Sequence, residues 1–207
     1  MRHPVDIIVP DTGPLITLAA ADRLDLLQSF ERPVRVLDVV KAECLRHPGK
    51  LAYDELKAWF ESTGGNQHQV VETPMINAYH AAVEQGARTG SSSPTKGMGD
   101  ATIVWFERNL PSLYQPGTTT LIMTEDATLG DVNLGRRAHV LSTRAFLKAL
   151  ENIEVIDSAA DIIRAVQDRG RAPSRYHQDR RGKDAAGDTT DWIEQAVALR
   201  NLDRFSR

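Results

Sequence analysis

Four carboxylic acids stand where a predicted strand ends or a predicted helix begins. Asp11 and Asp126 each follow a short apolar run. Asp100 follows a Gly-Met-Gly sequence that leads into a helical pattern, and Glu43 lies one turn into another helical pattern. The carboxyl ends of parallel strands meet at one edge of a sheet, so acids far apart in sequence can converge there.

Carboxylates that converge in this way would need a positive charge to offset their repulsion. Two carboxylates about 4 Å apart repel by about 4 kcal/mol at an effective dielectric of about 20, so a group of four needs protonation or a bound cation. An all-oxygen ligand set favours Mg²⁺ or Mn²⁺. These ions promote phosphodiester hydrolysis because they activate water and stabilise the attacking and leaving oxygens.

Each acid also has an ordinary structural explanation. Asp is common in turns and at helix N-caps, so Asp11 and Asp126 could be turn residues and Asp100 a helix cap. The sequence leaves both interpretations open. The metal-site interpretation requires the four acids to lie close together in the fold, and the structural interpretation does not.

The elements that would position the acids alternate along the chain. Strands are predicted at 5–9, 34–37, 70–71, 121–123 and 140–141. Helices are predicted at 15–19, 24–30, 39–45, 51–60, 73–85, from 100 onward and at 144–150, with Thr73 and Thr143 as N-caps and a Gly- and Ser-rich loop at 86–99. The strand runs are too short and too apolar to be amphipathic, which indicates an α/β fold with a mostly parallel sheet flanked by helices.

The pattern changes near residue 150, where we place a boundary between a domain at 1–150 and a helical, basic C-terminal extension at 151–207. The extension is expected to have no core of its own. It begins with a helix at 158–169 and ends with a helix from Thr190 that has one apolar face. That face is expected to dock on the body of the domain, on a second copy in a homodimer, or on a partner protein. The basic stretch from Arg164 to Lys183 either follows a phosphate backbone or forms a solvated linker.

Composition narrows the class of protein. The chain has 207 residues, a formal net charge of −3, 41% apolar residues and 26% charged residues, which is ordinary globular usage. No apolar run approaches the roughly 18 residues of a membrane span, and the first residues lack the apolar core of a signal peptide. A lone cysteine, Cys44, fits a reducing compartment. We therefore expect a cytoplasmic protein with no membrane segment.

Other kinds of site find little support. The six histidines show no metal-ligand spacing with one another or with Cys44, which argues against zinc. The sequence Gly97-Met98-Gly99 lacks the Gly-Lys-Ser/Thr ending of a phosphate-binding loop. Cys44 has no histidine near it in sequence and is predicted to be a core residue rather than a nucleophile.

Five stretches together resemble the landmarks of PIN-domain nucleases, in the expected order. They are VPDTGPLI at 9–16, VVKAE at 39–43, GMGDATI at 97–103, LIMTED at 121–126 and AHVLST at 138–143. The resemblance covers about residues 5 to 150. It implies a PIN-like three-layer fold.

The same resemblance implies a ribonuclease. Asp11, Glu43, Asp100 and Asp126 would surround one or two Mg²⁺ or Mn²⁺ ions and serve as both catalytic residues and metal ligands. Small PIN proteins of this length often look like the toxin of a toxin–antitoxin pair, so RNA is the expected substrate and an antitoxin an expected partner. A catalytically silent PIN-like module that binds RNA or a protein partner is the alternative.

Several residues beside the acids remain to be placed. Thr12 and Thr124 are expected to orient the carboxylates or a bound water by hydrogen bonding. Glu125 precedes Asp126, and the sequence does not decide which of the two points inward. Asp131 lies in a segment that departs from the family pattern and is a further candidate for the site.

Overall fold

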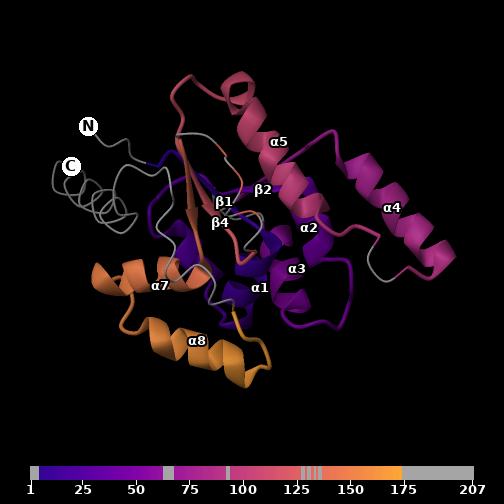
Figure 1. Cartoon of the computed structure of the whole chain (residues 1–207). Coiled ribbons are helices and arrows are strands. Elements are labelled where there is room, and N and C mark those ends of the chain that lie inside the picture. The colour runs from indigo at the N-terminus through magenta and orange to yellow at the C-terminus, as the bar shows by residue number, and fades with distance from the viewer. Residues whose placement is uncertain are drawn as a thin grey trace.

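The computed structural model describes residues 5–62, 68–91, 94–126, 129, 132, 134 and 137–173 (Figure 1). The helix predicted from Thr190, most of the basic stretch that ends at Lys183, and Asp131 lie outside the described residues.

Parallel strands form the centre of the described chain. Strands β1 (Ile7–Pro10), β4 (Thr120–Met123) and β5 (Ala138–Leu141) make a parallel sheet in the order β1-β4-β5, and β2 (Arg35–Leu37) pairs in parallel with β3 (Gln69–Val71). A single parallel bridge between Ile8 and Val34 joins the two sheets at β1. The chain thus runs outward on one side of β1 through β2 and β3, then returns to the other side through β4 and β5. Strand order reverses between β1 and β4, and ligands bind at such a point in open α/β sheets.

Helices surround these strands. They are α1 (Thr12–Ala20), the 3₁₀ helix η1 (Leu24–Gln28), α2 (Asp38–Cys44), α3 (Tyr53–Glu61), α4 (Ile76–Thr89), α5 (Met98–Leu113), α7 (Thr143–Asn152) and α8 (Ala159–Asp168). In Figure 1, α2, α4 and α5 lie to the right of the strands, and α7 and α8 lie to the lower left. Every residue of β1 and β4 is buried, as expected for strands covered on both faces. The predicted α/β class with a mostly parallel, helix-flanked sheet is confirmed, and the arrangement is compatible with three layers.

The predicted N-cap at Thr73 is wrong. Helix α4 begins at Ile76, and Met75 occupies its N-cap position. The backbone N–H and the hydroxyl of Thr73 instead donate to the Asp38 carboxylate at 2.7 and 2.8 Å. The side chain is used to join the segment after β3 to the start of α2, a long-range contact that competes with local capping.

Two other boundaries differ from the predicted ones. Helix α7 is capped by Ser142, whose Oγ accepts a hydrogen bond from the backbone N–H of Ala145 at 3.1 Å, so Thr143 is its first residue and not its cap. Helix α4 continues to Thr89, which shortens the loop predicted at 86–99. Gly90, with φ of 69°, ends that helix in the left-handed conformation that glycine adopts without strain.

The part of the chain described beyond residue 150 packs on the same core as the strands. Helix α8 contacts α1 and α7, and the buried apolar residues Ile156, Ile163 and Val166 belong to the core that the strands share. Its predicted N-cap, Ser158, is confirmed because the Ser158 hydroxyl accepts from the N–H of Asp161 at 3.1 Å. No helix among the described residues is long and apolar enough to cross a membrane.

Candidate active site

Asp11 lies at the point where the order of the strands reverses. It follows β1, and its backbone N–H donates to the carbonyl of Met123, the last residue of β4, at 2.8 Å. Asp11 stands at the N-cap position of α1, but its side chain makes no capping hydrogen bond. The carboxylate is buried, with 8% of the residue exposed, and its Oδ2 accepts from the hydroxyl of Thr124 at 3.3 Å. The side chain is therefore not used as an ordinary helix cap.

Glu43 reaches the same place from helix α2. Its Oε2 accepts a hydrogen bond from the hydroxyl of Thr12 at 2.8 Å. It also lies against the first turn of α5, where a Cβ built on Gly99 would come within 2.8 Å of Glu43 Oε2. Thr12 thus orients Glu43, and Thr124 orients Asp11, so the two threonines predicted to support the acids each contact one.

The first turn of α5 presents Asp100. The turn starts at Gly97, whose φ of 76° is a left-handed conformation that suits glycine. It is tied to the end of α2 because Nη1 of Arg46 donates to the hydroxyl of Thr95 at 2.9 Å. The left-handed conformation of Gly97 and the hydrogen bond between Arg46 and Thr95 fix the direction of the first turn of α5, and so the position of Asp100.

The four acids, here called the acid cluster (Asp11, Glu43, Asp100 and Asp126), interact electrostatically as one group. Burial raises the pKa of Asp11 to about 7, and the charges of Asp100 and Glu43 add to that rise. Burial and the charge of Asp100 raise the pKa of Glu43, while the Thr12 hydroxyl opposes the shift. Burial and the charge of Asp126 raise the pKa of Asp100. The structure therefore brings together the acids that the sequence singles out.

The cluster is not a preformed set of ligands. Among the described residues, no three His, Cys, Asp or Glu side chains lie close enough together to hold a metal ion. The donor chemistry nevertheless fits a hard divalent cation, since all four side chains offer only carboxylate oxygens. A cation would also relieve the repulsion that adds to the effect of burial in raising these pKa values.

Glu125 and Asp126 have different surroundings. The Glu125 carboxylate accepts from the hydroxyls of Thr17 and Thr143 at 2.6 and 2.7 Å and forms an ion pair with Nη2 of Arg171 at 2.8 Å. Asp126 is the neighbour that acts on Asp100, and its backbone N–H donates to the Thr124 hydroxyl at 3.0 Å. Glu125 is thus occupied by other partners.

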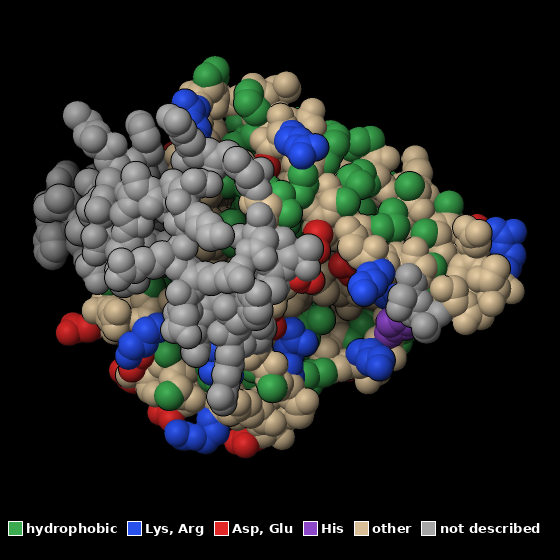
Figure 2. Space-filling model, in the orientation of Figure 1, with side chains coloured by type: hydrophobic (Ala, Val, Ile, Leu, Met, Phe, Trp, Pro, Cys, Tyr) green, Lys and Arg blue, Asp and Glu red, His purple; other side chains and the backbone are tan. Residues whose placement is uncertain are grey.

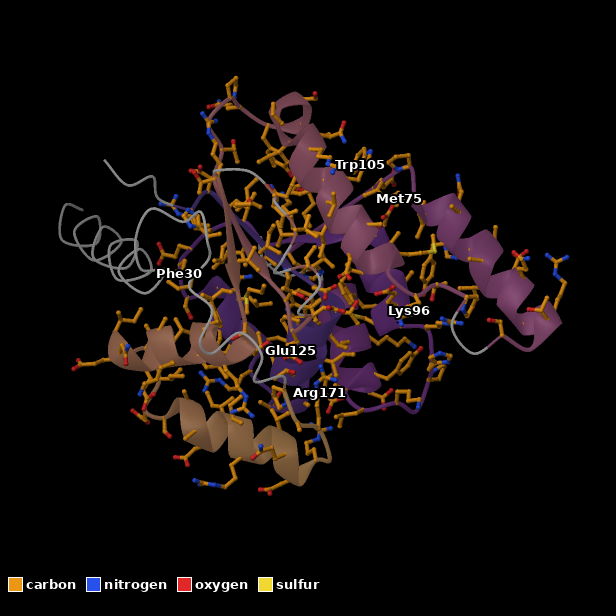
Figure 3. All side chains as sticks on the ribbon, in the orientation of Figure 1. Phe30, Met75, Lys96, Trp105, Glu125 and Arg171 are labelled. Atoms are coloured by element: carbon orange, nitrogen blue, oxygen red, sulfur yellow. The ribbon has the colours of Figure 1, made fainter. Side chains whose placement is uncertain are left out.

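Basic side chains lie on both sides of the acids. Figure 2 shows acidic side chains gathered at the centre of one face, with Lys and Arg side chains on either side. Figure 3 places Lys96 on one side of this centre and Arg171, beside Glu125, on the other. Lys96 is exposed on the turn before α5. Arg171 is paired with Glu125, so exposed Lys96 is the charge of the two that suits a polyanionic ligand.

Cys44 is buried in the core, which confirms its predicted role. Burial raises the pKa of its thiol, and the neighbouring charges of Asp11 and Glu43 raise it further. A thiol that resists ionisation is a poor nucleophile.

The sequence reasoning missed three residues that shape the site, namely Arg46, Thr17 and Arg171. Arg46 follows Glu43 by one helical turn, and that spacing is a signal that could have pointed to it. Arg171 lies 158 residues from Gly13, whose carbonyl it contacts, and such a distance leaves no local pattern.

The substitution Gly99→Ala is expected to weaken metal binding at the acid cluster without lowering the stability of the fold. Alanine in the interior of a helix is more stable than glycine by about 0.5–1 kcal/mol, so we expect an equal or higher melting temperature. The added methyl group would meet Glu43 Oε2 at 2.8 Å and displace that flexible side chain from the acid cluster. Calorimetric titration with Mn²⁺ should then show affinity at least tenfold weaker than in the unsubstituted protein.

Gly90→Ala is the matched control, because a Cβ at Gly90 meets nothing within 4 Å. With its φ of 69°, this control should lose stability and keep its Mn²⁺ affinity, the reverse of the pattern at Gly99. Unchanged affinity in Gly99→Ala would mean that Glu43 is not a ligand.

Compared with protein-family models, with curated proteins and with solved structures, the chain shows no match to any of them.

Proposed function

We propose that this protein is a divalent-metal-dependent ribonuclease of the PIN class. The observation that carries the proposal is that Asp11, buried at the reversal point between β1 and β4, lies within electrostatic range of Glu43 from α2 and Asp100 from α5, and that Asp126 acts in turn on Asp100. Such a cluster is costly to assemble without a cation, because like charges in a partly buried site raise one another's pKa. The choice of RNA as the polyanionic substrate rests on the motifs shared with PIN domains.

The acid cluster would hold Mg²⁺ or Mn²⁺. When bound, such a cation supplies Lewis acidity, which lowers the pKa of water and offsets the charge of a phosphodiester in the transition state. The chain's own residues provide the orientation. Thr12 and Thr124 fix the carboxylates of Glu43 and Asp11 by hydrogen bonds, and exposed Lys96 lies where it can contact a phosphate of the substrate.

The biological setting follows from the same resemblance. As the toxin of a toxin–antitoxin pair, the protein would act on RNA in the cytoplasm and be held inactive by an antitoxin protein. Co-expression with a neighbouring small gene product and co-purification of the two chains would test this setting independently of the chemistry.

Metal binding gives the first test. Without metal the acids repel one another, so Mn²⁺ at about 100 times its dissociation constant should stabilise the fold by about 2.7 kcal/mol. For a chain of this length that corresponds to a rise in melting temperature of roughly 5–10 °C, measured by differential scanning fluorimetry. NaCl at the same ionic strength controls for non-specific ionic effects. No shift with Mn²⁺ or Mg²⁺ would favour the catalytically silent PIN-like module.

Cleavage should depend on both metal and pH. Ligand carboxylates must be ionised and the attacking water must lose a proton, so the rate should rise from pH 6 to pH 8. Excess EDTA should abolish cleavage of a labelled RNA, and added Mn²⁺ should restore it. Cleavage that persists undiminished in EDTA would contradict the proposed chemistry.

A further inference from the structure

The segment that follows α8 turns back across the beginning of α1. Gly170, with φ of 84°, makes the turn, and residues 169–173 then run over α1 and α7; we call these five residues the strap. Nη1 of Arg169 donates to the carbonyl of Ala20 at 2.9 Å, and Nε of Arg144 donates to the carbonyl of Pro173 at 3.1 Å. The strap is therefore fixed to the body at both ends.

Arg171 lies in the middle of the strap and bridges two chain segments. Its Nε donates to the Thr17 hydroxyl at 2.9 Å, and its Nη2 donates to the carbonyl of Gly13 at 3.1 Å and to Glu125 Oε2 at 2.8 Å. Gly13 belongs to the segment that carries Asp11, and Glu125 belongs to the segment that carries Asp126. One guanidinium thus joins the segments that follow β1 and β4 (Figure 3).

The contacts of Glu125 close the network. Its Oε1 accepts from Thr17 on α1 and from Thr143 on α7, so each of its oxygens has a partner. Only 10% of the Glu125 side chain and 26% of the Arg171 side chain are exposed. In this largely buried pair, both Glu125 oxygens and the Nε and Nη2 of Arg171 are hydrogen-bonded, which favours one well-defined geometry, since its alternatives leave a charge without a partner.

We propose that Arg171 is a positioning residue of the nuclease site. Arg171 holds Glu125, and so the Thr124–Asp126 segment, at a fixed place relative to Asp11. This inference rests on the proposed function for its consequence in catalysis.

Direct contact of Arg171 with RNA is the competing explanation. The donors on Nε and Nη2 are already directed at three protein acceptors, which argues against it. The two roles predict different kinetics. A residue that binds RNA phosphates affects KM and the salt dependence of binding, whereas a residue that positions the acids affects kcat, because small misplacements of reacting groups cost up to about a hundredfold in rate.

The test compares Arg171→Met with Arg169→Met in the full chain. Arg169 lies in the same strap and also forms an ion pair, with Glu55 at 2.6 Å, but it contacts the far end of α1. We expect Arg171→Met to lower kcat for Mn²⁺-dependent RNA cleavage by tenfold to about a hundredfold with KM and salt dependence unchanged. Arg169→Met should keep kcat within about twofold, by the same reasoning.

Amide hydrogen exchange measures positioning without reference to activity. In Arg171→Met, the amides of Gly13, Leu15 and residues 124–126 should exchange at least tenfold faster than in the unsubstituted protein, and in Arg169→Met they should not. Should Arg171→Met fail to fold, Glu125→Gln, which keeps the shape of the side chain and removes the ion pair, takes its place in both measurements.

The outcomes separate the two proposals. Unchanged exchange at 124–126 overturns the positioning role, whether or not the protein cleaves RNA. A raised KM with unchanged kcat also overturns it, in favour of RNA contact. An unsubstituted protein that neither binds Mn²⁺ nor cleaves RNA overturns the proposed function, while faster exchange in Arg171→Met would still support the strap as the element that fixes these segments.

Discussion

Asp11→Asn is expected to abolish metal-dependent cleavage and to stabilise the metal-free protein above pH 7. The pKa of Asp11 is raised from 3.8 to about 7 in the fold. Between these pH values the folded state binds a proton that the unfolded state has released, so stability falls as pH rises and stays low above pH 7. At about 1.4 kcal/mol per pKa unit, the stability lost approaches about 4 kcal/mol. Asparagine has no charge to bury and should avoid this loss.

Urea denaturation in EDTA at several pH values between 4 and 8 would measure this effect. Asp100→Asn should likewise lose activity, since Asp100 is coupled to Asp11. Asp161→Asn is the control, because Asp161 is exposed and its ion pair within the described part of the chain is with Arg164 one helical turn away, and such surface changes alter stability by less than about 0.5 kcal/mol. Full activity of both Asp11→Asn and Asp100→Asn on structured and unstructured RNAs would refute the assigned site.

Glu107→Gln should produce a large gain in stability at alkaline pH without touching the acid cluster. Glu107 lies in α5 with 8% of the residue exposed, and its Oε1 has no hydrogen-bond partner among the described residues. Burial raises its pKa from 4.5 to about 7, although the Thr120 hydroxyl opposes the shift. The folded state again holds the proton to higher pH, so the unsubstituted protein should lose up to roughly 3 kcal/mol between pH 4.5 and pH 7.

Glu107→Gln has no carboxyl group to ionise at this position, so its free energy of unfolding should change less with pH above pH 5. Its melting temperature at pH 8 should be higher than that of the unsubstituted protein. The matched variant Glu151→Gln, which loses only the half-exposed pair with Lys148, should follow the pH profile of the unsubstituted protein. Parallel profiles for Glu107→Gln and the unsubstituted protein would show that Glu107 ionises in the fold as easily as in the unfolded chain.

Local patterns in the sequence were sufficient for much of the fold and for the positions of Asp11 and Asp126 after β1 and β4. The runs before Asp11 and Asp126 are strongly apolar and β-branched, so the strands and the acids at their ends could be identified together. The glycines before Asp100 marked the start of a helix correctly. Because parallel strands place their carboxyl ends at one edge, the two acids that follow strands, Asp11 and Asp126, could be expected at that edge.

The partners of polar side chains could not be predicted in this way. Thr73 has the sequence context of an N-cap, yet it binds Asp38, which lies 35 residues away. Glu125 and Asp126 are adjacent acids after the same strand, and only the position of Arg171, 46 residues further on, decides how Glu125 is used. Contacts of this kind depend on tertiary packing, which a window of sequence does not contain.

The residues of the candidate site are far apart in sequence, so the site cannot form until most of the described chain has been synthesised. Thr124 and Asp11 are 113 residues apart, and Arg171 and Gly13 are 158 apart. Closing such long loops is slow, and synthesis delivers the N-terminal residues first. Asp11 and Glu43 therefore leave the ribosome well before the strap that fixes their neighbours. A chain that cuts RNA would thereby remain harmless to its own message and ribosome until nearly all of the described body has been made.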